Sequence, residues 1–441
     1  MKRVAVLGAG FVTKPAVDYL LDKCGYQVLV TSLIQSEAET LIDGRPAGRA
    51  IALSVEQTEL LDPLVEEVDL VLSMIPPSKH LPVAHACIRH GKNMVTTSYV
   101  SNEMEVLDGA CRKKGIVILN EIGEDPGLDN MSVKGTIDQV REAGGEVSRV
   151  LSYGAGLPAF EHNNNPMGYK FSWRPKGVIL AAQTPASYIE NGKVVNVPGK
   201  NLFDHCRLVD LAGVGSFEAY PNRDCRKYLE CFQLNNKVSF FRGILRNIGW
   251  CATMKGLADL KLLDDTGEND FANTTYASFA AMLIGEDDTD RIVEKTARFL
   301  KVDERSDLIK KLTWLGLFDE RKVDVVSGSN ADILVEMMTR RMSYDPMERD
   351  MVILHNEITA TFPRKKEKRM STLLVRGEPG GESAMSRAVS LPAAIASRLI
   401  LEGKIEEKGV LRPTVKRIYQ PVLEEMENFG FRFTDTTQRI S

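Results

Sequence analysis

The chain has 441 residues, of which 43% are hydrophobic and 26% are charged, a balance typical of a globular protein with two or three domains. Its formal net charge of −4 and pI near 6.0 argue against a nucleic-acid partner, so an anionic substrate must be bound by local cations. No apolar run is long enough to cross a bilayer, and the first predicted strand begins within the first three residues, which leaves no room for a signal peptide. We therefore expect a cytoplasmic protein without a membrane partner.

The seven cysteines and six histidines are scattered along the chain. No two cysteines form a C-x-x-C pair, and no two histidines have the spacing of metal ligands. We expect reduced thiols, as in a reducing cytosol, and no metal site.

Strand and helix patterns alternate through the first 120 residues, which predicts an α/β fold with a doubly wound, Rossmann-type parallel sheet. Ser36 and Ser101 are expected to begin the second and fifth helices as caps. The predicted strands are 3–7, 27–31, 49–53, 69–74, 93–96 and 116–119. The predicted helices are 12–23, 36–42, 57–66, 79–90 and 102–114.

The pattern changes after Gly127, and residues 243–345 have the charged, periodic character of a separate helical lobe. A long amphipathic helix over 383–403 is expected to pack back on the first domain. The other predicted elements are a helix over 128–142 and strands over 149–153, 350–354 and 371–375.

A glycine loop follows the first predicted strand, as in dinucleotide-binding folds. Gly8 permits a tight turn, and Gly10 allows the backbone to approach a pyrophosphate at a helix N-terminus. Thr13 stands at the third glycine of the usual motif, so an ordinary glycine turn is the alternative.

The end of the second predicted strand distinguishes the two nicotinamide cofactors. A carboxylate there binds the 2′-hydroxyl of NAD, whereas a cation accommodates the 2′-phosphate of NADP. Residues 30–34 contain neither, but the hydroxyls of Thr31 and Ser32 are suited to a phosphate. We therefore favour NADP, the alternative being that these hydroxyls cap the next helix. Three cations are expected nearby, at Lys14, Arg45 and Arg49.

Three polar segments, 74–77, 96–99 and 123–127, follow predicted strands at the edge where such sheets bind ligands. Asp125 precedes Pro126 ahead of a helix, which suits both a cap and a ligand. Tyr99 is compatible with a hydrogen bond to a substrate carboxylate and with a buried structural role.

Two later segments, Gly168 to Arg174 and Ala219 to Asp224, mix aromatic side chains with cations. Guanidinium groups bind carboxylates in bidentate fashion, so these segments suit a substrate with several carboxylates. The alternative is that their arginines are solvated surface charges.

Together these segments resemble the saccharopine reductase family, the NADP-dependent, L-glutamate-forming saccharopine dehydrogenases of lysine metabolism by the α-aminoadipate pathway. The resemblance covers nearly the whole chain. Its strongest elements are Gly10 to Thr13, Val95 to Ser101, Asn120 to Gly123, Asp125 to Gly127, Gly156 to Ala159, Gly168 to Trp173 and Ala219 to Asp224.

The resemblance implies three domains and two sets of contacts. The dinucleotide-binding domain comprises 1–127 and about 384–441, the α/β substrate-binding domain about 128–242 and 346–383, and the helical lobe about 243–345. The implied cofactor contacts are Gly8, Ala9, Gly10, Phe11, Val12, Thr31, Ser32, Leu33, Ser54, Val55, Ile75, Thr97, Glu124, Asp125, Pro126 and Arg174. The implied substrate contacts are Ser98, Tyr99, Asp125, Phe171, Arg223, Ile244, Leu245 and Arg246, with Tyr99 and Asp125 taking part in catalysis.

Four positions depart from the family pattern. Leu33 replaces the usual arginine after the second strand, which leaves NAD as the alternative cofactor. Ser54 stands for an aspartate, Gly154 for a cysteine and Asn130 for a histidine.

The implied reaction converts saccharopine, NADP and water reversibly into glutamate, 2-aminoadipate 6-semialdehyde and NADPH, by hydride transfer at an imine carbon. Arg223 and Arg246 would bind carboxylates, Tyr99 would orient one of them, and Asp125 would favour the protonated amine or iminium. The alternatives are a carboxyspermidine- or carboxynorspermidine-type dehydrogenase and a non-catalytic NADP-binding regulator. A homodimer is the expected assembly.

Overall fold

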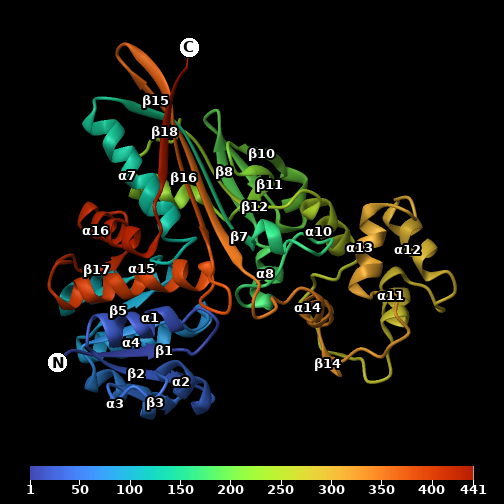
Figure 1. The fold of residues 1–441 in the computed structure, drawn as a ribbon, viewed down its shortest axis with the longest axis horizontal. Coiled ribbons are helices and arrows are strands. Elements are labelled where there is room, and N and C mark those ends of the chain that lie inside the picture. The colour runs from blue at the N-terminus through green and yellow to red at the C-terminus, as the bar shows by residue number, and fades with distance from the viewer. Residues whose placement is uncertain (441) are drawn as a thin grey trace. The chain divides into compact units, whose positions relative to one another are not determined.

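The computed structural model describes residues 1–440, and the chain divides into two compact units (Figure 1). Unit 1 comprises Met1–Gly156, Tyr228–Asn235 and Met351–Ser441, and unit 2 comprises Leu157–Lys227 and Asn236–Asp350.

Unit 1 contains a parallel sheet of seven strands in the order β17-β6-β5-β4-β1-β2-β3, which confirms the predicted doubly wound fold. Six strands were expected, and the seventh, β17, is contributed by residues far along the chain and pairs in parallel with β6. The strands are β1 (Arg3–Leu7), β2 (Gln27–Ser32), β3 (Gly48–Ala52), β4 (Leu70–Ser73), β5 (Asn93–Thr96), β6 (Val117–Leu119) and β17 (Gly409–Leu411).

Helices cover both faces of this sheet because its central strands, β1 and β4, carry buried side chains on both faces. Ala5 and Leu7 of β1 belong to a buried cluster that includes side chains of α3 and α4, while α15 packs on α1, β4 and β5. The helices are α1 (Lys14–Asp18), α2 (Gln35–Ile42), α3 (Thr58–Glu67), α4 (His80–His90), α5 (Asn102–Glu105), α6 (Asp108–Lys114), α15 (Ala384–Leu401) and α16 (Lys416–Met426).

Three helix boundaries differ from the prediction. The expected helix 12–23 is α1 followed by a π-helical turn over Tyr19–Lys23, and the expected helix 102–114 is divided into α5 and α6. Ser101 caps α5 by accepting a hydrogen bond from the Met104 N–H at 3.1 Å, as predicted. Ser36, by contrast, lies inside α2, whose N-cap is Ile34.

By length and composition, the 18-residue helix α15 could cross a membrane. However, 78% of the helix is buried inside the protein. Its burial against the parallel sheet identifies it as a core helix of unit 1, as its amphipathic pattern predicted.

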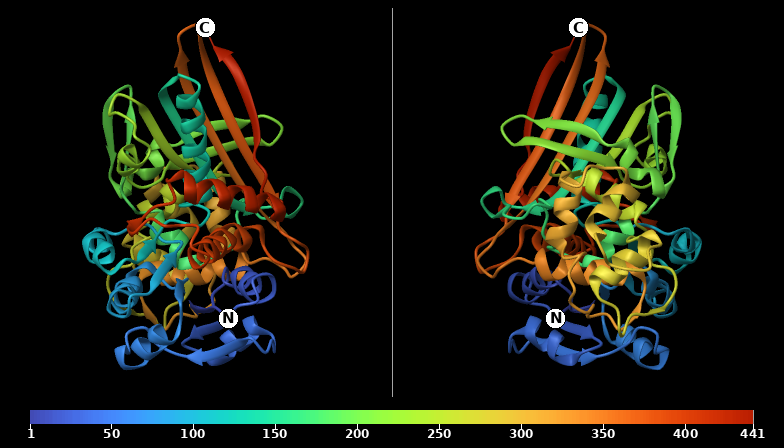
Figure 2. Two further views of the ribbon diagram at one scale, coloured as in Figure 1. Left: turned by 90° about the vertical axis from the view of Figure 1, so that its left-hand side faces the viewer. Right: turned by 90° about the vertical axis from the view of Figure 1, so that its right-hand side faces the viewer.

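A second, antiparallel sheet in unit 1 has the strand order β7-β15-β16-β18, with the long helix α7 (Leu128–Glu142) preceding its first strand (Figure 2). The short helix α9 (Tyr228–Cys231) also belongs to unit 1. The strands are β7 (Glu146–Pro158), β15 (Asp350–Phe362), β16 (Lys365–Arg376) and β18 (Thr434–Ile440).

Unit 2 combines antiparallel strands with a helical segment. β11 pairs with β10 and β12, and β8 pairs with β12 and β9. The elements are α8 (Pro175–Ala181), β8 (Ala186–Glu190), β9 (Lys193–Val197), β10 (Arg207–Leu211), β11 (Gly215–Pro221), β12 (Ser239–Arg246), α10 (Trp250–Asp259), β13 (Asn269–Asp270), α11 (Tyr276–Ile284), α12 (Ile292–Leu300), α13 (Asp307–Leu315), β14 (Ser327–Gly328) and α14 (Asn330–Arg341).

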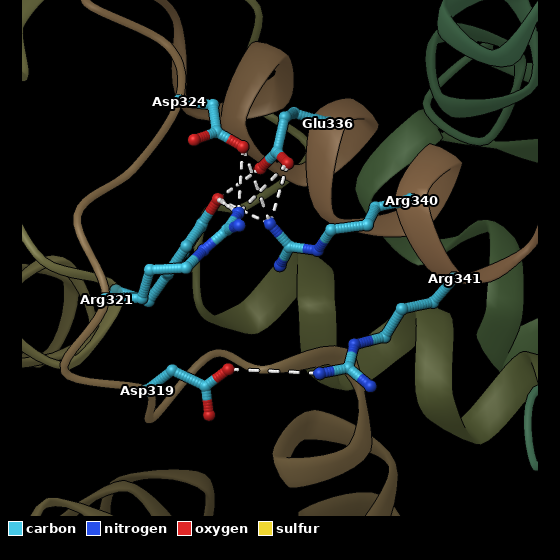
Figure 3. A network of polar contacts seen from close by, with 7 residues as sticks. Asp319, Arg321, Asp324, Glu336, Arg340 and Arg341 are labelled. Carbon is cyan, nitrogen blue, oxygen red and sulfur yellow. Dashed lines mark hydrogen bonds and ion pairs between the residues drawn. The ribbon is translucent and has the colours of Figure 1, made fainter.

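An ion-pair network joins α14 to the loop after α13 (Figure 3). Arg321 pairs with Asp324 at 2.8 Å, Arg340 pairs with Glu336 at 2.8 Å, and both guanidinium groups donate to the Tyr276 hydroxyl. Charges shared among several partners hold a loop better than isolated surface pairs do, so this network fixes the loop on the helical segment.

Candidate active site

The loop between β1 and α1 approaches the end of β4 closely. Gly8 has φ +103° and donates its N–H to the Thr31 carbonyl at 2.9 Å. A Cβ on Gly8 would lie 3.2 Å from both Ile75 Cγ2 and the Met74 carbonyl, so a larger residue would be strained there. A Cβ on Gly10 would meet no atom within 4 Å, which leaves open space beside the backbone at the start of the helix. This arrangement fits a bound pyrophosphate.

Exposed apolar side chains lie at the same edge of the sheet as this loop. Phe11 and Leu33 are each 77% exposed and Ile34 is 56% exposed, and all three lie at the ends of β1 and β2. Ser54 and Val55, which were also expected to contact the cofactor, follow β3 on the same edge of the sheet. An exposed apolar rim of this kind suits the flat face of a nucleobase.

The three cations expected at a 2′-phosphate are engaged elsewhere. Lys14 pairs with Asp18, Arg45 pairs with Asp18 at 2.7 Å and with Asp22 at 2.6 Å, and Arg49 lies 3.6 Å from Glu67. Each of these side chains thus has a carboxylate partner, and its use at a 2′-phosphate stays a prediction.

The first turn of α2 instead brings a carboxylate to the end of β2. Ser32 donates its hydroxyl to Glu37 Oε2 at 2.6 Å and accepts the Ile34 N–H at 3.3 Å. Residues 30–34 contain no acid, but the fold supplies one from the next helix.

Tyr99 and Asp125 lie together at the carboxyl ends of β5 and β6. The Tyr99 hydroxyl donates to Asp125 Oδ1 at 2.7 Å, and both side chains are half-buried. Ser98 precedes Tyr99 and also lies on this edge of the sheet. The pair provides a carboxylate and a phenol in the place where parallel α/β sheets bind ligands.

Asp125 does not cap the following helix. Helix α7 begins at Leu128 with Gly127 as its N-cap, and the Gly127 N–H donates to Asp129 Oδ1 at 2.7 Å. The cap interpretation is therefore wrong, because the Asp125–Pro126 peptide lies one residue before the cap and Asp125 accepts from Tyr99 instead.

The loop from Gly123 to Gly127 is tightly closed. Gly127 has φ +153°, and a Cβ there would fall 1.9 Å from the Gly123 carbonyl oxygen, so only glycine fits. The Gly123 N–H donates to the Pro126 carbonyl at 2.9 Å. This closure fixes Glu124 and Asp125, and a Cβ on Gly123 would lie 3.0 Å from Thr97 Cβ.

His80 connects the ends of two strands and was missed by the sequence analysis. Its Nδ1 lies 2.9 Å from Ser73 Oγ, and its Nε2 lies 2.8 Å from Ser98 Oγ and 3.1 Å from Thr96 Oγ1. Burial lowers the pKa of His80 to about 4, so the ring is neutral at pH 7. A single histidine at the first residue of an amphipathic helix gives no spacing signal.

The stability of the protein should therefore depend on His80 in mild acid. A histidine whose pKa is lower in the folded state loses stability as the pH falls from its unfolded value near 6.5 towards its folded value. Between pH 7 and pH 4.5 this loss amounts to about 2 kcal/mol. Urea titrations at pH 7 and pH 4.5 measure the fall in unfolding free energy on acidification. This fall should be about 2 kcal/mol smaller in His80→Asn than in the parent.

His85→Asn is the matched control, because His85 is exposed on the same helix. It should lose as much stability on acidification as the parent. An equal loss in His80→Asn and the parent would contradict the prediction.

A cavity of about 340 Å³ adjoins His80 and Tyr99 within unit 1. It is lined by Pro77, Ser78, His80, Leu81, Tyr99, Ser101, Glu103, Met104 and Asn120. The hydroxyl, imidazole and carboxylate groups in this lining are set in a mainly apolar wall, and Tyr99 connects the cavity to Asp125.

Glu121 is a buried carboxylate with a structural role. It has φ +57°, and it accepts hydrogen bonds from the Tyr228 hydroxyl at 2.8 Å, Arg412 Nε at 3.0 Å and the Val100 N–H at 3.1 Å. These bonds join α9 to the segments that follow β5 and β17, so the Asn-Glu-Ile-Gly motif stabilises unit 1 as well as positioning the loop that follows.

Two departures from the family pattern lie near Asp125. A Cβ on Gly154 would be 3.3 Å from Asp125 Oδ2 and 3.2 Å from Leu354 Cδ2, so no thiol stands beside that carboxylate. Asn130 is buried, and its Nδ2 has no hydrogen-bond partner among residues 1–440.

The remaining candidate residues lie in unit 2. Arg246 is buried, with its guanidinium 4.8 Å from the centre of the Tyr169 ring and 5.5 Å from that of Trp250. It follows Ile244 and Leu245 on β12. Phe171 is buried, whereas Arg174 is exposed at the N-cap of α8.

Arg223 is exposed and has φ +56°, a left-handed conformation that is uncommon for arginine. Its carbonyl accepts the Ser187 N–H at 3.0 Å, which holds the backbone in place. Observed strain of this kind is enriched at ligand sites.

Comparison with known proteins gives matches over both parts of the chain. Residues 4–119 match the saccharopine dehydrogenase NADP binding domain, and residues 123–431 match the saccharopine dehydrogenase C-terminal domain. The saccharopine dehydrogenase [NADP(+), L-glutamate-forming] of Schizosaccharomyces pombe is 35% identical, over 99% of both chains. The alpha-aminoadipic semialdehyde synthase of Bos taurus is 35% identical over 98% of this chain and 47% of its own length.

Among solved structures, the apo saccharopine dehydrogenase (L-Glu forming) from Saccharomyces cerevisiae superposes with a TM-score of 0.89 at 32% identity. The match covers 99% of this chain and all of that one.

Proposed function

Because the chain belongs to the saccharopine dehydrogenase family, we infer that it is an NADP-dependent oxidoreductase of lysine metabolism, the L-glutamate-forming saccharopine dehydrogenase. It converts saccharopine, NADP and water into glutamate, 2-aminoadipate 6-semialdehyde and NADPH. The observation that carries this inference is the match over nearly the full length of enzymes with that activity.

The residues at the carboxyl edge of the parallel sheet fit the cofactor. We propose that the β1–α1 loop binds the pyrophosphate, because the tight turn at Gly8 and the open space beside Gly10 allow a phosphate to approach the backbone at the start of α1. Phe11, Leu33 and Ile34 would flank the adenine, and Thr97 with residues 124–126 would lie towards the nicotinamide. When bound, the cofactor accepts hydride from the substrate carbon.

Tyr99 and Asp125 are the proposed catalytic residues. The Asp125 carboxylate lies where it can stabilise the positive charge of a secondary amine or iminium, and its bond from Tyr99 fixes its orientation. Holding the reacting atoms in one geometry removes part of the entropic barrier. Ser98, whose hydroxyl contacts neutral His80, would complete the polar edge.

Arg223 and Arg246 are the proposed carboxylate-binding residues. Saccharopine carries three carboxylates, and buried Arg246 is suited to one of them because two aromatic rings hold its guanidinium plane. A carboxyspermidine-type substrate has fewer carboxylates and would leave an arginine without a partner, so that alternative is not favoured.

The test is turnover on the purified protein. We expect NADPH to form when saccharopine and NADP are supplied together, with glutamate released in equal amount. Turnover of carboxynorspermidine but not saccharopine would contradict the proposal. Binding of NADP without turnover of either substrate would instead support a non-catalytic NADP-binding regulator.

Glu37 should oppose the 2′-phosphate of NADP, because its carboxylate accepts from Ser32 at the end of β2. We expect the ratio of NADP affinity to NAD affinity to be about fivefold higher in Glu37→Gln than in the parent. This change corresponds to about 1 kcal/mol, the scale of one charge near a solvent-exposed site. Fluorescence titration of both cofactors measures the ratio.

Glu39→Gln serves as the control for Glu37, since Glu39 accepts from Gln35 on the same helix. Its NADP-to-NAD ratio should equal that of the parent. An unchanged ratio in Glu37→Gln would mean that the carboxylate does not face the 2′ position.

The assembly and compartment are further proposals. We propose a homodimer, the commonest closed assembly of soluble enzymes, to be checked by light scattering. We propose a cytoplasmic location, supported by seven free cysteines in the described part of the chain. The division into three domains stays a prediction.

A further inference from the structure

Two thiols and a carboxylate from three elements of unit 2 lie together. Cys206 immediately precedes β10, Glu218 lies on β11, and Cys251 is the second residue of α10. The Sγ atoms of the two cysteines and a carboxylate oxygen of Glu218 all lie within 4.8 Å of one another. Cys251 is buried, whereas Cys206 and Glu218 are half-buried, so the cluster is reachable from solvent on one side.

This geometry is close to that of a tetrahedral zinc site. Zinc bonds of about 2.3 Å to sulfur and about 2.0 Å to oxygen place neighbouring donor atoms about 3.3–3.8 Å apart. Donors already within 4.8 Å therefore need to move by about 1 Å or less to coordinate one cation. Two thiolates with one carboxylate are donors that zinc-class cations accept, and water can fill the fourth position.

The carboxylate is held in place by the backbone of α10. Glu218 Oε1 accepts the Gly249 N–H at 3.0 Å, and Oε2 accepts the Cys251 N–H at 2.8 Å. These bonds explain Glu218 as a cap of the helix, yet each oxygen retains a lone pair for a cation. Ligating carboxylates are commonly oriented by hydrogen bonds of this kind.

The charges within the cluster favour a cation. The donor atoms of two thiols and a carboxylate lie within 4.8 Å of one another, and thiolates formed beside that carboxylate would repel it unless a cation lay between them. Two lysines from the surrounding elements pair with other groups, Lys255 with Asp204 and Lys311 with Asp307.

We propose that Cys206, Glu218 and Cys251 bind one zinc-class divalent cation, with water as the fourth ligand. Binding forms two metal–sulfur bonds and one metal–oxygen bond, and it releases the thiol protons to solvent without any change of oxidation state. The cation joins β10, β11 and the start of α10. The first residue of that helix, Trp250, packs against Arg246, so the site stiffens the support of a proposed substrate residue.

The first experiment measures metal binding directly. The full-length protein is stripped with chelator, loaded with Zn²⁺, desalted and analysed by elemental mass spectrometry. We expect one zinc per chain in the parent and in Cys24→Ser, a half-buried thiol elsewhere, and at least about hundredfold weaker binding in Cys206→Ser and Cys251→Ser. Equal binding in all four proteins would overturn the proposal.

The second experiment needs no variant and so does not depend on the folding of one. The parent is alkylated with iodoacetamide with and without Cd²⁺, and the modified cysteines are mapped by mass spectrometry. We expect Cd²⁺ to protect Cys206 and Cys251 but not the other cysteines. Absence of this selective protection, or a Cys206–Cys251 disulfide as the only chemistry of the pair, would overturn the proposal.

Discussion

Asp125→Asn should fold normally and lose at least about a hundredfold in kcat for saccharopine oxidation. Asparagine keeps an oxygen that can accept from the Tyr99 hydroxyl, so the local hydrogen bond survives. It removes the negative charge, and removal of one electrostatic stabiliser from an active site typically costs this much in rate. Because Asp125 does not cap α7, no loss of helix stability is expected, and the unfolding free energy should stay within about 1 kcal/mol of the parent. A thermal melt and NADPH formation on one preparation measure both effects.

The control is Asp138→Asn, which changes a second tyrosine–aspartate pair in unit 1. Asp138 accepts from the Tyr419 hydroxyl at 2.7 Å and pairs with Lys134, and it lies on α7, about three helical turns beyond Gly127. It should lower stability and leave kcat unchanged. Full activity in Asp125→Asn would remove Asp125 from the chemical step.

Arg223→Ala should lower kcat/KM for saccharopine far more than it changes the KM for NADP. Arg223 is exposed in the free protein, but a bound carboxylate would cover it, and loss of one hydrogen-bonded charge from such a desolvated pair costs about 2–5 kcal/mol, which is about thirtyfold or more in binding. The left-handed backbone at Arg223 supports this expectation, since the structure maintains an unfavourable conformation there. Initial rates with each substrate varied in turn separate the two KM values.

Arg226→Ala is the matched control, because Arg226 follows on the same loop and pairs with Asp224 at 2.7 Å. It is expected to change kcat/KM by less than about twofold, as for a surface ion pair. If Arg223→Ala behaves in the same way, Arg223 is a solvated surface charge and the proposed substrate position is wrong.

The parallel sheet was predictable because its central strands, β1 and β4, are apolar runs that the fold buries, and the helices between the strands have a clear period. The strand β17 was not, since Gly409, Val410 and Leu411 form too short a run to show any pattern. Only its pairing with β6 identifies it as a strand.

The site was predictable where it depends on position in the fold and unpredictable where it depends on contacts. Tyr99 and Asp125 follow adjacent strands, so their proximity follows from the parallel sheet. Whether Asp125 caps α7 depends on the residue at which the helix begins. A difference of one or two residues decides the question, and the local sequence does not determine it.

Charge partners were the least predictable feature. Arg45 and Lys14 were expected to serve a phosphate, but both pair with Asp18, which lies one helical turn after Lys14 and far before Arg45 in the sequence. Glu37 is three residues beyond the strand-end segment and reaches back to Ser32 through the first turn of α2. Likewise, Cys206 and Cys251 are far apart in sequence, so no spacing rule could reveal the cluster that they form with Glu218.

The pairing of β17 with β6 has a consequence for synthesis of the protein. Gly409 pairs with Val117, 292 positions earlier, and residues of unit 2 are translated between them. At typical elongation rates the ribosome needs about 15–60 s to make that intervening chain. Throughout this interval the nascent parallel sheet presents β6 as an unpaired edge, which is a template for pairing with other chains. Aggregation of the nascent chain through this edge, more than the stability of the folded protein, should therefore limit the yield. Chaperones that bind strand edges should act on the chain before residue 409 emerges.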